Sequence, residues 1–133
     1  MCGISGILSK KNIDLNDENI IKLITNLQYN RGPDSSDIKI YSNCIFGHNR
    51  LKIIDLSNLG SQPMETDQYS IVFNGEIYNY LDLKNELLQN NITFNSTSDT
   101  EVLLKCFEYY GIEETLNKIN GMVAIGLYNK LES

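Results

Sequence analysis

Cys2 is a candidate for catalysis because it directly follows Met1. We expect Met1 to be trimmed, since Cys2 is small, which places a thiol and a free α-amino group on one residue. An α-amino group titrates near pH ~7.7–8.0, so it can act as the base for its own thiol, directly or through water. Cys2 is therefore a candidate nucleophile that needs no histidine. The alternative is that a cysteine at position 2 is incidental.

The segment Phe73-Asn74-Gly75-Glu76 carries two hydrogen-bond donors at the expected end of a strand. The side-chain amide of Asn74 and the backbone N–H of Gly75 can converge on one oxygen atom. Such a pair forms an oxyanion hole, in which each donor stabilises the transition state by roughly 3 kcal/mol. The simpler interpretation is a tight Asn-Gly turn, which is the more common meaning of this dipeptide.

Two further charged residues can hold the ends of an amino acid. Arg50 shares a strand face with His48 and can clamp a carboxylate through two parallel hydrogen bonds. Asp99 begins a predicted helix, where it can bind an ammonium group or simply favour the helix dipole. His48 is the only histidine, and without a partner in the sequence it is interpreted as structural.

Together these residues supply a nucleophile, a base, two oxyanion donors, a cation for a carboxylate and an anion for an ammonium group. This inventory suits an amino acid whose side chain carries a reactive acyl group. The three cysteines, Cys2, Cys44 and Cys106, fit no disulfide framework and no zinc spacing. We therefore expect no metal site.

Hydrophobic periodicity predicts the elements that must position these residues. Strands are expected over residues 1–9, 38–41, 44–54, 69–73 and 122–128. Helices are expected from a cap at Asn16 or Asp17 to about Tyr29, over 81–88, and from a capping box at 98–101 to Tyr110. The charges of the tight loop 31–34 are expected to pair with each other. The mixed order of strands and helices predicts α+β layers and not regular βαβ units.

Length and composition narrow the functional classes. The 133 residues suit one domain, and 41% hydrophobic with 21% charged residues indicates a soluble globular protein. The net charge of −6 argues against nucleic acid as the main partner. No stretch reaches the roughly 20 apolar residues of a membrane span. Because the start lacks the features of a secretory signal, we expect a reducing cytoplasm.

Seven motifs occur in order between Met1 and about Tyr128. They are Met-Cys-Gly-Ile-Ser-Gly-Ile, Arg-Gly-Pro-Asp, Gly-His-Asn-Arg-Leu-Lys-Ile-Ile-Asp-Leu, Gln-Pro-Met, Phe-Asn-Gly-Glu-Ile-Tyr-Asn-Tyr, Ser-Asp-Thr-Glu-Val-Leu-Leu and Asn-Gly-Met-Val-Ala. The set strongly resembles the glutaminase domain of glutamine-hydrolysing asparagine synthetases, which are class II glutamine amidotransferases. Because seven motifs in one order are highly specific, the resemblance raises Cys2 from an isolated signal to the expected nucleophile.

The resemblance implies an N-terminal nucleophile hydrolase fold, with αββα layers and two stacked antiparallel sheets. It implies that the Cys2 thiolate attacks the side-chain carbonyl of glutamine, with the oxyanion held by Asn74 and Gly75. The α-amino group of Cys2 then protonates the leaving ammonia, and water hydrolyses the thioester to release glutamate.

The same resemblance implies the residues that bind glutamine. Arg50 would take the α-carboxylate, and Glu76 and Asp99 would take the α-amino group. Backbone groups of residues 51–54 would line the same pocket, which adds Leu51, Ile53 and Ile54 to the expected site.

In the family the released ammonia reaches a synthetase domain in which ATP and Mg²⁺ activate aspartate, while the glutaminase domain needs no cofactor. The sequence ends at Ser133, before the later strands of the family and before any synthetase domain. We therefore expect a truncated type 2 glutamine amidotransferase domain over residues 1–133, with a synthetase domain in cis or in trans. Homodimerisation stays open. The alternatives are a non-catalytic remnant or interaction module, and an amidotransferase with another ammonia acceptor.

Overall fold

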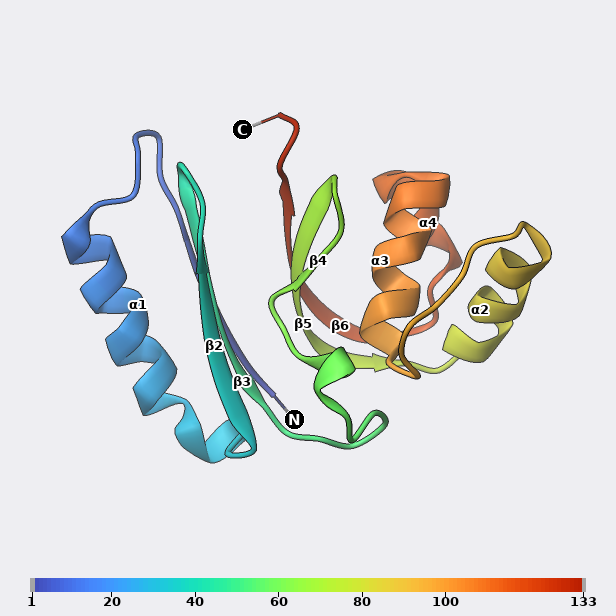
Figure 1. Ribbon diagram of the computed structural model, residues 1–133, viewed down its shortest axis with the longest axis horizontal. Helices are drawn as coiled ribbons and strands as arrows, with labels where there is room; N and C mark the ends of the chain where they lie inside the picture. The colour runs from blue at the N-terminus through green and yellow to red at the C-terminus, as the bar shows by residue number, and fades with distance from the viewer. Residues whose placement is uncertain (1, 133) are drawn as a thin grey trace.

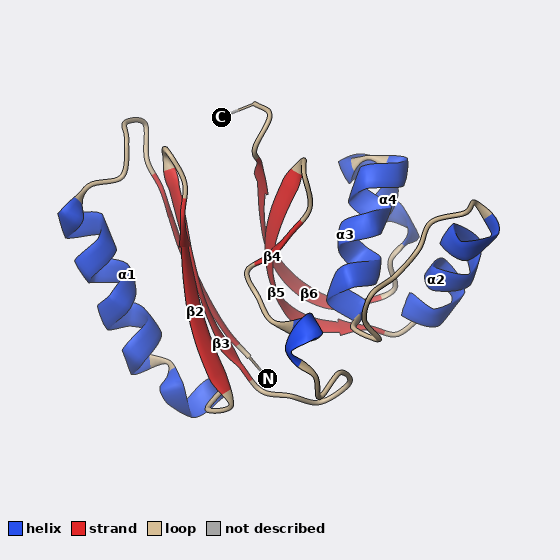
Figure 2. Ribbon diagram, viewed as in Figure 1, coloured by secondary structure: helices blue, strands red, loops and turns tan. Residues whose placement is uncertain are grey.

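Two three-stranded antiparallel sheets lie between helices in the computed structural model, which describes residues 2–132 (Figures 1 and 2). The first sheet has the order β1 (Gly3–Leu8), β3 (Cys44–Arg50) and β2 (Ser35–Ile40). The second has the order β4 (Met64–Glu65), β5 (Tyr69–Ile77) and β6 (Gly121–Asn129). The predicted α+β class with two stacked antiparallel sheets is therefore confirmed.

The helices cover the outer faces of both sheets. Helix α1 (Leu15–Leu27) packs on β1 and β3. On the other side α3 (Asp99–Tyr110) packs on β5, and α2 (Tyr80–Gln89) and α4 (Ile112–Lys118) pack on α3 (Figure 1). This gives the predicted αββα order of layers. No helix within residues 2–132 is both long and apolar enough to cross a bilayer.

Alternation along β5 divides the apolar core in two. Ile71 and Phe73 face the helices and pack with Leu103 and Phe107 of α3 in the larger cluster. Val72 faces the first sheet, where a smaller cluster joins Cys44, Phe46, Val72 and Tyr128. Because successive side chains of a strand point to opposite faces, Asn74 lies on the same face as Val72, between the sheets.

Two strand predictions differ from the structure near the expected site. β3 ends at Arg50 and not at residue 54, so residues 51–54 form a loop. The predicted Asn74-Gly75 turn is wrong, because β5 runs on to Ile77 and pairs Asn74 with Ala124 and Gly75 with Val123 of β6. Glycine is required at position 75 for another reason: a Cβ there would lie 2.1 Å from the Met122 carbonyl oxygen.

The remaining predicted elements form with shifted ends. β2 begins at Ser35, three residues earlier than predicted. The predicted strand start at Met1 lies outside the described residues. Strand β4, helix α4 and the short 3-10 helices η1 (Tyr29–Arg31) and η2 (Asn58–Gly60) were not predicted, because each is too short for a periodic pattern.

The predicted cap of α1 is wrong, and that of α3 is confirmed in part. Helix α1 is capped by Asp14 and not by Asn16 or Asp17, because the Asp14 carboxylate accepts the Asn16 and Asp17 N–H groups at 2.9 and 3.0 Å. Ser98 does cap α3, with its hydroxyl accepting the Thr100 N–H.

The reciprocal bond of the predicted capping box at 98–101 is absent. The Glu101 carboxylate instead accepts hydrogen bonds from the backbone N–H groups of Asn95 and Ser96, which precede the cap, at 2.9 and 2.7 Å. The loop before α3 is therefore tied to the first turn of the helix.

Candidate functional site

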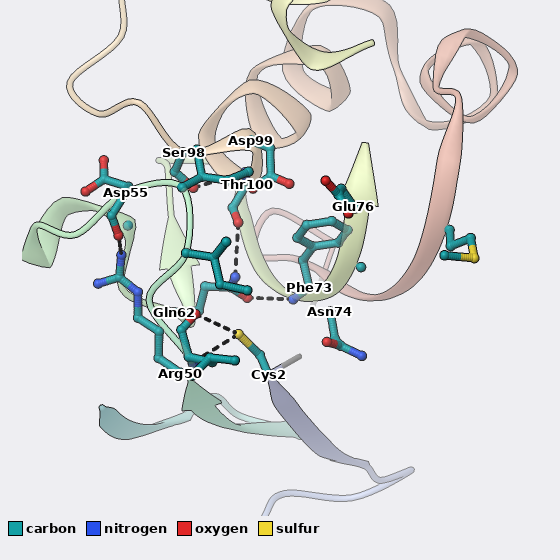
Figure 3. A pocket seen from close by; sticks show the side chains of 16 residues that line it. Cys2, Arg50, Asp55, Gln62, Phe73, Asn74, Glu76, Ser98, Asp99 and Thr100 are labelled. Carbon is teal, nitrogen blue, oxygen red and sulfur yellow. Dashed lines mark hydrogen bonds between the residues drawn. The ribbon is translucent and has the colours of Figure 1, made fainter. Parts of the chain in front are cut away.

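A cavity of about 170 Å³ opens where Cys2, the end of β3, the second half of β5 and the start of α3 meet (Figure 3). It is smaller than the roughly 300–1,000 Å³ of sites for drug-sized ligands, and suits a ligand of amino-acid size. The structure brings all of the predicted site residues to its wall: Cys2, Arg50, Leu51, Ile53, Ile54, Asn74, Gly75, Glu76 and Asp99.

The thiol of Cys2 is oriented by the loop that follows β3. Its Sγ accepts a hydrogen bond from the Leu51 N–H at 3.3 Å and lies 3.7 Å from the Leu51 carbonyl oxygen. The Cys2 carbonyl accepts a bond from Arg31 Nε at 3.2 Å. The thiol is half-buried at the wall of the cavity, which leaves it open to a ligand.

The loop 31–34 supports this end of the site and does not pair its own charges, which corrects the prediction. Arg31 donates to the Cys2 carbonyl, and Asp34 accepts the Lys52 N–H at 2.8 Å. A Cβ at Gly32 would lie 2.2 Å from the Asn49 carbonyl oxygen, so the loop packs directly on the end of β3.

Arg50 is a buried cation whose described partners are neutral. Its side chain, 5% exposed, donates to the carbonyls of Asp55 and Ser57 at 2.6 Å each and to the Ser61 hydroxyl at 3.3 Å. A guanidinium has five N–H donors, so Nε–H and one Nη2–H have no protein acceptor within residues 2–132. These two donors form a fork that matches a carboxylate.

Asp99 is the complementary case, a buried carboxylate at the wall of the same cavity. It is 7% exposed and forms no salt bridge with any described cation. Burial raises the pKa of Asp99 above its usual range, and the nearby Glu76 adds to this shift. Glu76 is exposed, and in Figure 3 its side chain and that of Asp99 lie at the same end of the cavity. An ammonium group that enters the cavity would offset the free-energy cost of burying this charge.

Asn74 lies at the other end of the cavity, with Cys2 (Figure 3). Its side-chain amide forms no hydrogen bond with the described residues and is therefore free to donate to a ligand. Gly75 follows on the cavity wall. The cavity thus brings a nucleophile and an amide donor together with the two charged groups Arg50 and Asp99.

Gln62 is a site residue that the sequence does not indicate as such. Its Oε1 accepts the Phe73 N–H at 2.6 Å and its Nε2 donates to the Thr100 hydroxyl at 3.0 Å, so it joins β5 to the start of α3 (Figure 3). The Gln-Pro-Met motif is a signal, but only the fold shows that Gln62 meets Thr100, 38 positions away.

His48 is buried between the sheets and is not a base in this site. It is 1% exposed with no partner for Nε2 among the described residues, and burial, together with the nearby Arg50, lowers its pKa to about 4. The imidazole is therefore neutral at pH 7, which agrees with the structural interpretation of His48.

The buried imidazole leads to a prediction about acid stability. The unfolded chain binds a proton at His48 near pH 6.5 and the folded chain only near pH 4, so acid favours unfolding between these values. Protonation of His48 in the unfolded chain should lower the free energy of unfolding by about 3 kcal/mol as the pH drops from about 6.5 to about 4. Urea unfolding at several pH values, with His48→Gln as the control, measures it. An equal pH dependence in both proteins would contradict the assignment.

Comparison with known protein families and structures agrees with the geometry of the cavity. A model of the glutamine amidotransferase domain matches residues 1–133. The chain is 42% identical to asparagine synthetase [glutamine-hydrolyzing] 1 of Bacillus subtilis over 98% of its length, and 39% identical to asparagine synthetase [glutamine-hydrolyzing] 2 of rice over 96%. It covers only 21% of each of these proteins, so it spans about a fifth of the length of its relatives.

Solved structures confirm the predicted fold. Glutamine phosphoribosylpyrophosphate amidotransferase of B. subtilis superimposes with a TM-score of 0.58 at 22% identity, over 68% of this chain and 22% of that one. A structure described as the allosteric regulatory enzyme of purine biosynthesis gives the same score at 21% identity, over 69% of this chain and 23% of its own. At this identity the likeness concerns the fold alone.

Proposed function

The chain belongs to the glutamine amidotransferase domain family, and from this premise we propose that the cavity hydrolyses the side-chain amide of glutamine with Cys2 as the nucleophile. The observation that carries the proposal is a pair of buried charges, each without an oppositely charged partner among the described residues, beside a half-buried thiol. Arg50 lacks an anion and Asp99 lacks a cation among the described residues, and an α-amino acid supplies both.

Binding would orient glutamine along the cavity. Its α-carboxylate would meet the free Nε–H and Nη2–H of Arg50, and its α-amino group would meet Asp99, with Glu76 nearby. Residues 51–54 would border the bound molecule through Leu51, Ile53 and Ile54. The side chain would then extend away from Asp99, toward Cys2 and Asn74 (Figure 3).

Removal of Met1, which lies outside the described residues, is part of the proposal because it frees the α-amino group of Cys2. The α-amino group takes the proton of the Cys2 thiol as the sulfur forms a bond to the amide carbon, and the oxyanion is held by the Asn74 side chain and the Gly75 N–H. The C–N bond breaks as the α-amino group passes a proton to the leaving ammonia. Water then attacks the thioester, releasing glutamate and restoring the thiol.

The fate of the ammonia lies beyond these residues. The names of the relatives indicate asparagine synthesis, so we propose a synthetase domain, in cis or in trans, that uses ATP and Mg²⁺ to activate aspartate. Residues 2–132 contain no group of three histidine, cysteine or acidic side chains that could hold a metal ion, and no step above uses one. We also propose a cytoplasmic location. The alternative to asparagine synthesis is an amidotransferase with another ammonia acceptor.

A second candidate, an interaction module, is favoured by the edge strand β6. Residues 121–129 carry no charge, and Met122 and Val123 are 66% and 38% exposed, although natural edge strands usually carry protective charges. Such a module would fold and bind a partner strand without releasing glutamate from glutamine.

Glutamate and ammonia production separates the two candidates. Incubation of the processed chain with glutamine should release the two products in equal amounts, measured by separate enzymatic assays. Folding is verified by a cooperative thermal transition, and loss of Met1 by intact mass. A folded, processed chain that releases neither product would overturn the glutaminase proposal.

Asp99 gives the proposal a pH signature. Its protonated form cannot pair with an ammonium group, and burial with the nearby Glu76 raises its pKa. The affinity of the inactive Cys2→Ala chain for glutamine should therefore fall along an acid limb with a pKa above the ordinary value of about 3.9. Asp99→Asn should remove this limb and weaken binding. Glu76→Gln should move the limb to lower pH, because it removes a neighbouring negative charge, and an unmoved limb would contradict the assignment to Asp99.

A further inference from the structure

The carboxylate of Asp55 connects two segments of the cavity wall. Its Oδ1 accepts the Ser57 N–H at 2.7 Å and the Ser57 hydroxyl at 2.6 Å. Its Oδ2 accepts the Thr97 N–H at 2.9 Å and the Thr97 hydroxyl at 3.1 Å. Asp55 is 7% exposed, so these bonds replace most of its hydration. One buried side chain thus joins the loop after β3 to the segment before α3.

The first arm of Asp55 leads to Arg50. Ser57, held by Oδ1, accepts a hydrogen bond from Arg50 Nη1 on its carbonyl at 2.6 Å. The Asp55 carbonyl accepts from Arg50 Nη2 at 2.6 Å (Figure 3). A Cβ at Gly60 would lie 2.4 Å from Nη2, so the loop wraps closely around the guanidinium. Displacement of this loop would therefore displace Arg50.

The second arm leads to Asp99. Thr97, held by Oδ2, directly precedes Ser98, whose hydroxyl caps α3 by accepting the Thr100 N–H at 3.1 Å. Asp99 is the first residue of α3. A change in the position of Thr97 would therefore shift the cap and the carboxylate that follows it.

We propose that Asp55 is a positioning residue that fixes the separation of Arg50 and Asp99 and thereby makes the site selective for an L-α-amino acid. The inference rests on the proposed function for the assignment of these two groups to the α-carboxylate and the α-amino group. The α-carbon is chiral, so its carboxylate, amino group and side chain point in fixed directions relative to one another. Two anchors at a fixed separation, with one path for the side chain, therefore accept one hand of the substrate.

The charge of Asp55 is maintained by the same contacts. Hydrogen bonds from the side chain of Ser57 and the backbone of Thr97 lower its pKa to about 2, so the carboxylate stays ionised and accepts bonds on both oxygens. Asp55→Asn replaces one carboxylate oxygen with an amide NH2 group. This group faces a backbone N–H and cannot accept a hydrogen bond from it. One of the two arms is then broken while the size of the side chain is kept.

The test measures binding of the product L-glutamate and of D-glutamate to the full chain by isothermal titration. The unsubstituted chain should bind L-glutamate at least about tenfold more tightly than D-glutamate. Asp55→Asn should weaken L-glutamate by about 10- to 100-fold, as expected for a lost bond to a buried charge, and bring the two enantiomers within about threefold. Thr97→Val, which removes one of the four bonds, should reduce the preference by a smaller factor.

Asp14→Asn is the matched control, because Asp14 also accepts backbone N–H groups at the start of a helix but does not line the cavity. It should keep the enantiomer preference of the unsubstituted chain. A structural role for Asp55 would weaken both enantiomers by the same factor, and that result would overturn the proposal, as would an unchanged preference in Asp55→Asn. Glutamate release from glutamine is assayed separately, so an inactive chain that still selects L-glutamate would reject the proposed hydrolysis and leave the role of Asp55 standing.

Discussion

Replacing Cys2 with alanine is expected to abolish glutamine hydrolysis, with kcat/KM lower by about 10⁴-fold or more. No other cysteine can take its place, because burial raises the pKa of Cys44 to about 11 and of Cys106 to about 12. Both thiols are buried and protonated at neutral pH, whereas Cys2 is half-buried at the cavity. Steady-state glutamate release by both proteins measures the effect.

Two further measurements make this prediction specific to Cys2. Iodoacetamide should alkylate Cys2 faster than the buried cysteines in the folded chain, as read by peptide mass spectrometry. The control Cys44→Ala should keep its activity at temperatures below its unfolding transition, because Cys44 packs in the core between the sheets. Activity that survives Cys2→Ala, or that is lost equally in Cys44→Ala at equal folded fraction, would contradict the assignment.

The second large effect is expected at Asn74. Asn74→Ala should lower kcat by about 10²- to 10³-fold and change KM by no more than a few-fold, because the amide donates to an oxyanion that exists only during the reaction. Asn74→Asp should cost at least as much, since a carboxylate accepts hydrogen bonds and repels the oxyanion. Stopped assays over a range of glutamine concentrations separate kcat from KM.

An exposed asparagine provides the matched control for this substitution. Asn16 lies in the first turn of α1, outside the cavity, and Asn16→Ala should leave kcat unchanged. A rise in KM with an unchanged kcat in Asn74→Ala would show that Asn74 binds the ground state of the substrate and would remove it from the oxyanion hole.

The candidate site residues could be predicted from the sequence because their motifs carry side-chain chemistry. Cys2, Arg50, Asn74 and Asp99 each offer a distinct reactive or charged group, and the structure brings them to one cavity. The layers follow from strong periodicity in α1 and α3 and from the alternation of β5. The roles of these residues stay predictions until the substitutions are measured.

Local sequence patterns were misleading where tertiary contacts decide the conformation. Asn74-Gly75 has the composition of a tight turn, yet pairing with β6 keeps both residues in a strand, and the glycine is needed for the close approach to Met122. Arg31 and Asp34 have opposite charges and lie three positions apart, yet each binds a backbone group elsewhere in the fold.

The supporting residues could not be predicted because their partners are distant in sequence. Asp55 meets Thr97 over 42 positions, and Gln62 meets Thr100 over 38. Neither side chain has a reactive role of its own, so a motif search gives it no function. Only the stacking of the first sheet against the second and α3 brings these pairs together.

Trapping of the thioester at Cys2 tests the central claim most directly. The processed chain is mixed with glutamine, quenched in acid within the turnover time, digested and examined by mass spectrometry. A γ-glutamyl group should appear on the N-terminal peptide that begins with Cys2, through a bond that hydroxylamine cleaves, and it should be absent from Cys2→Ala. A chain that hydrolyses glutamine and yields no adduct, or one that carries the adduct on another residue, would contradict Cys2 as the nucleophile.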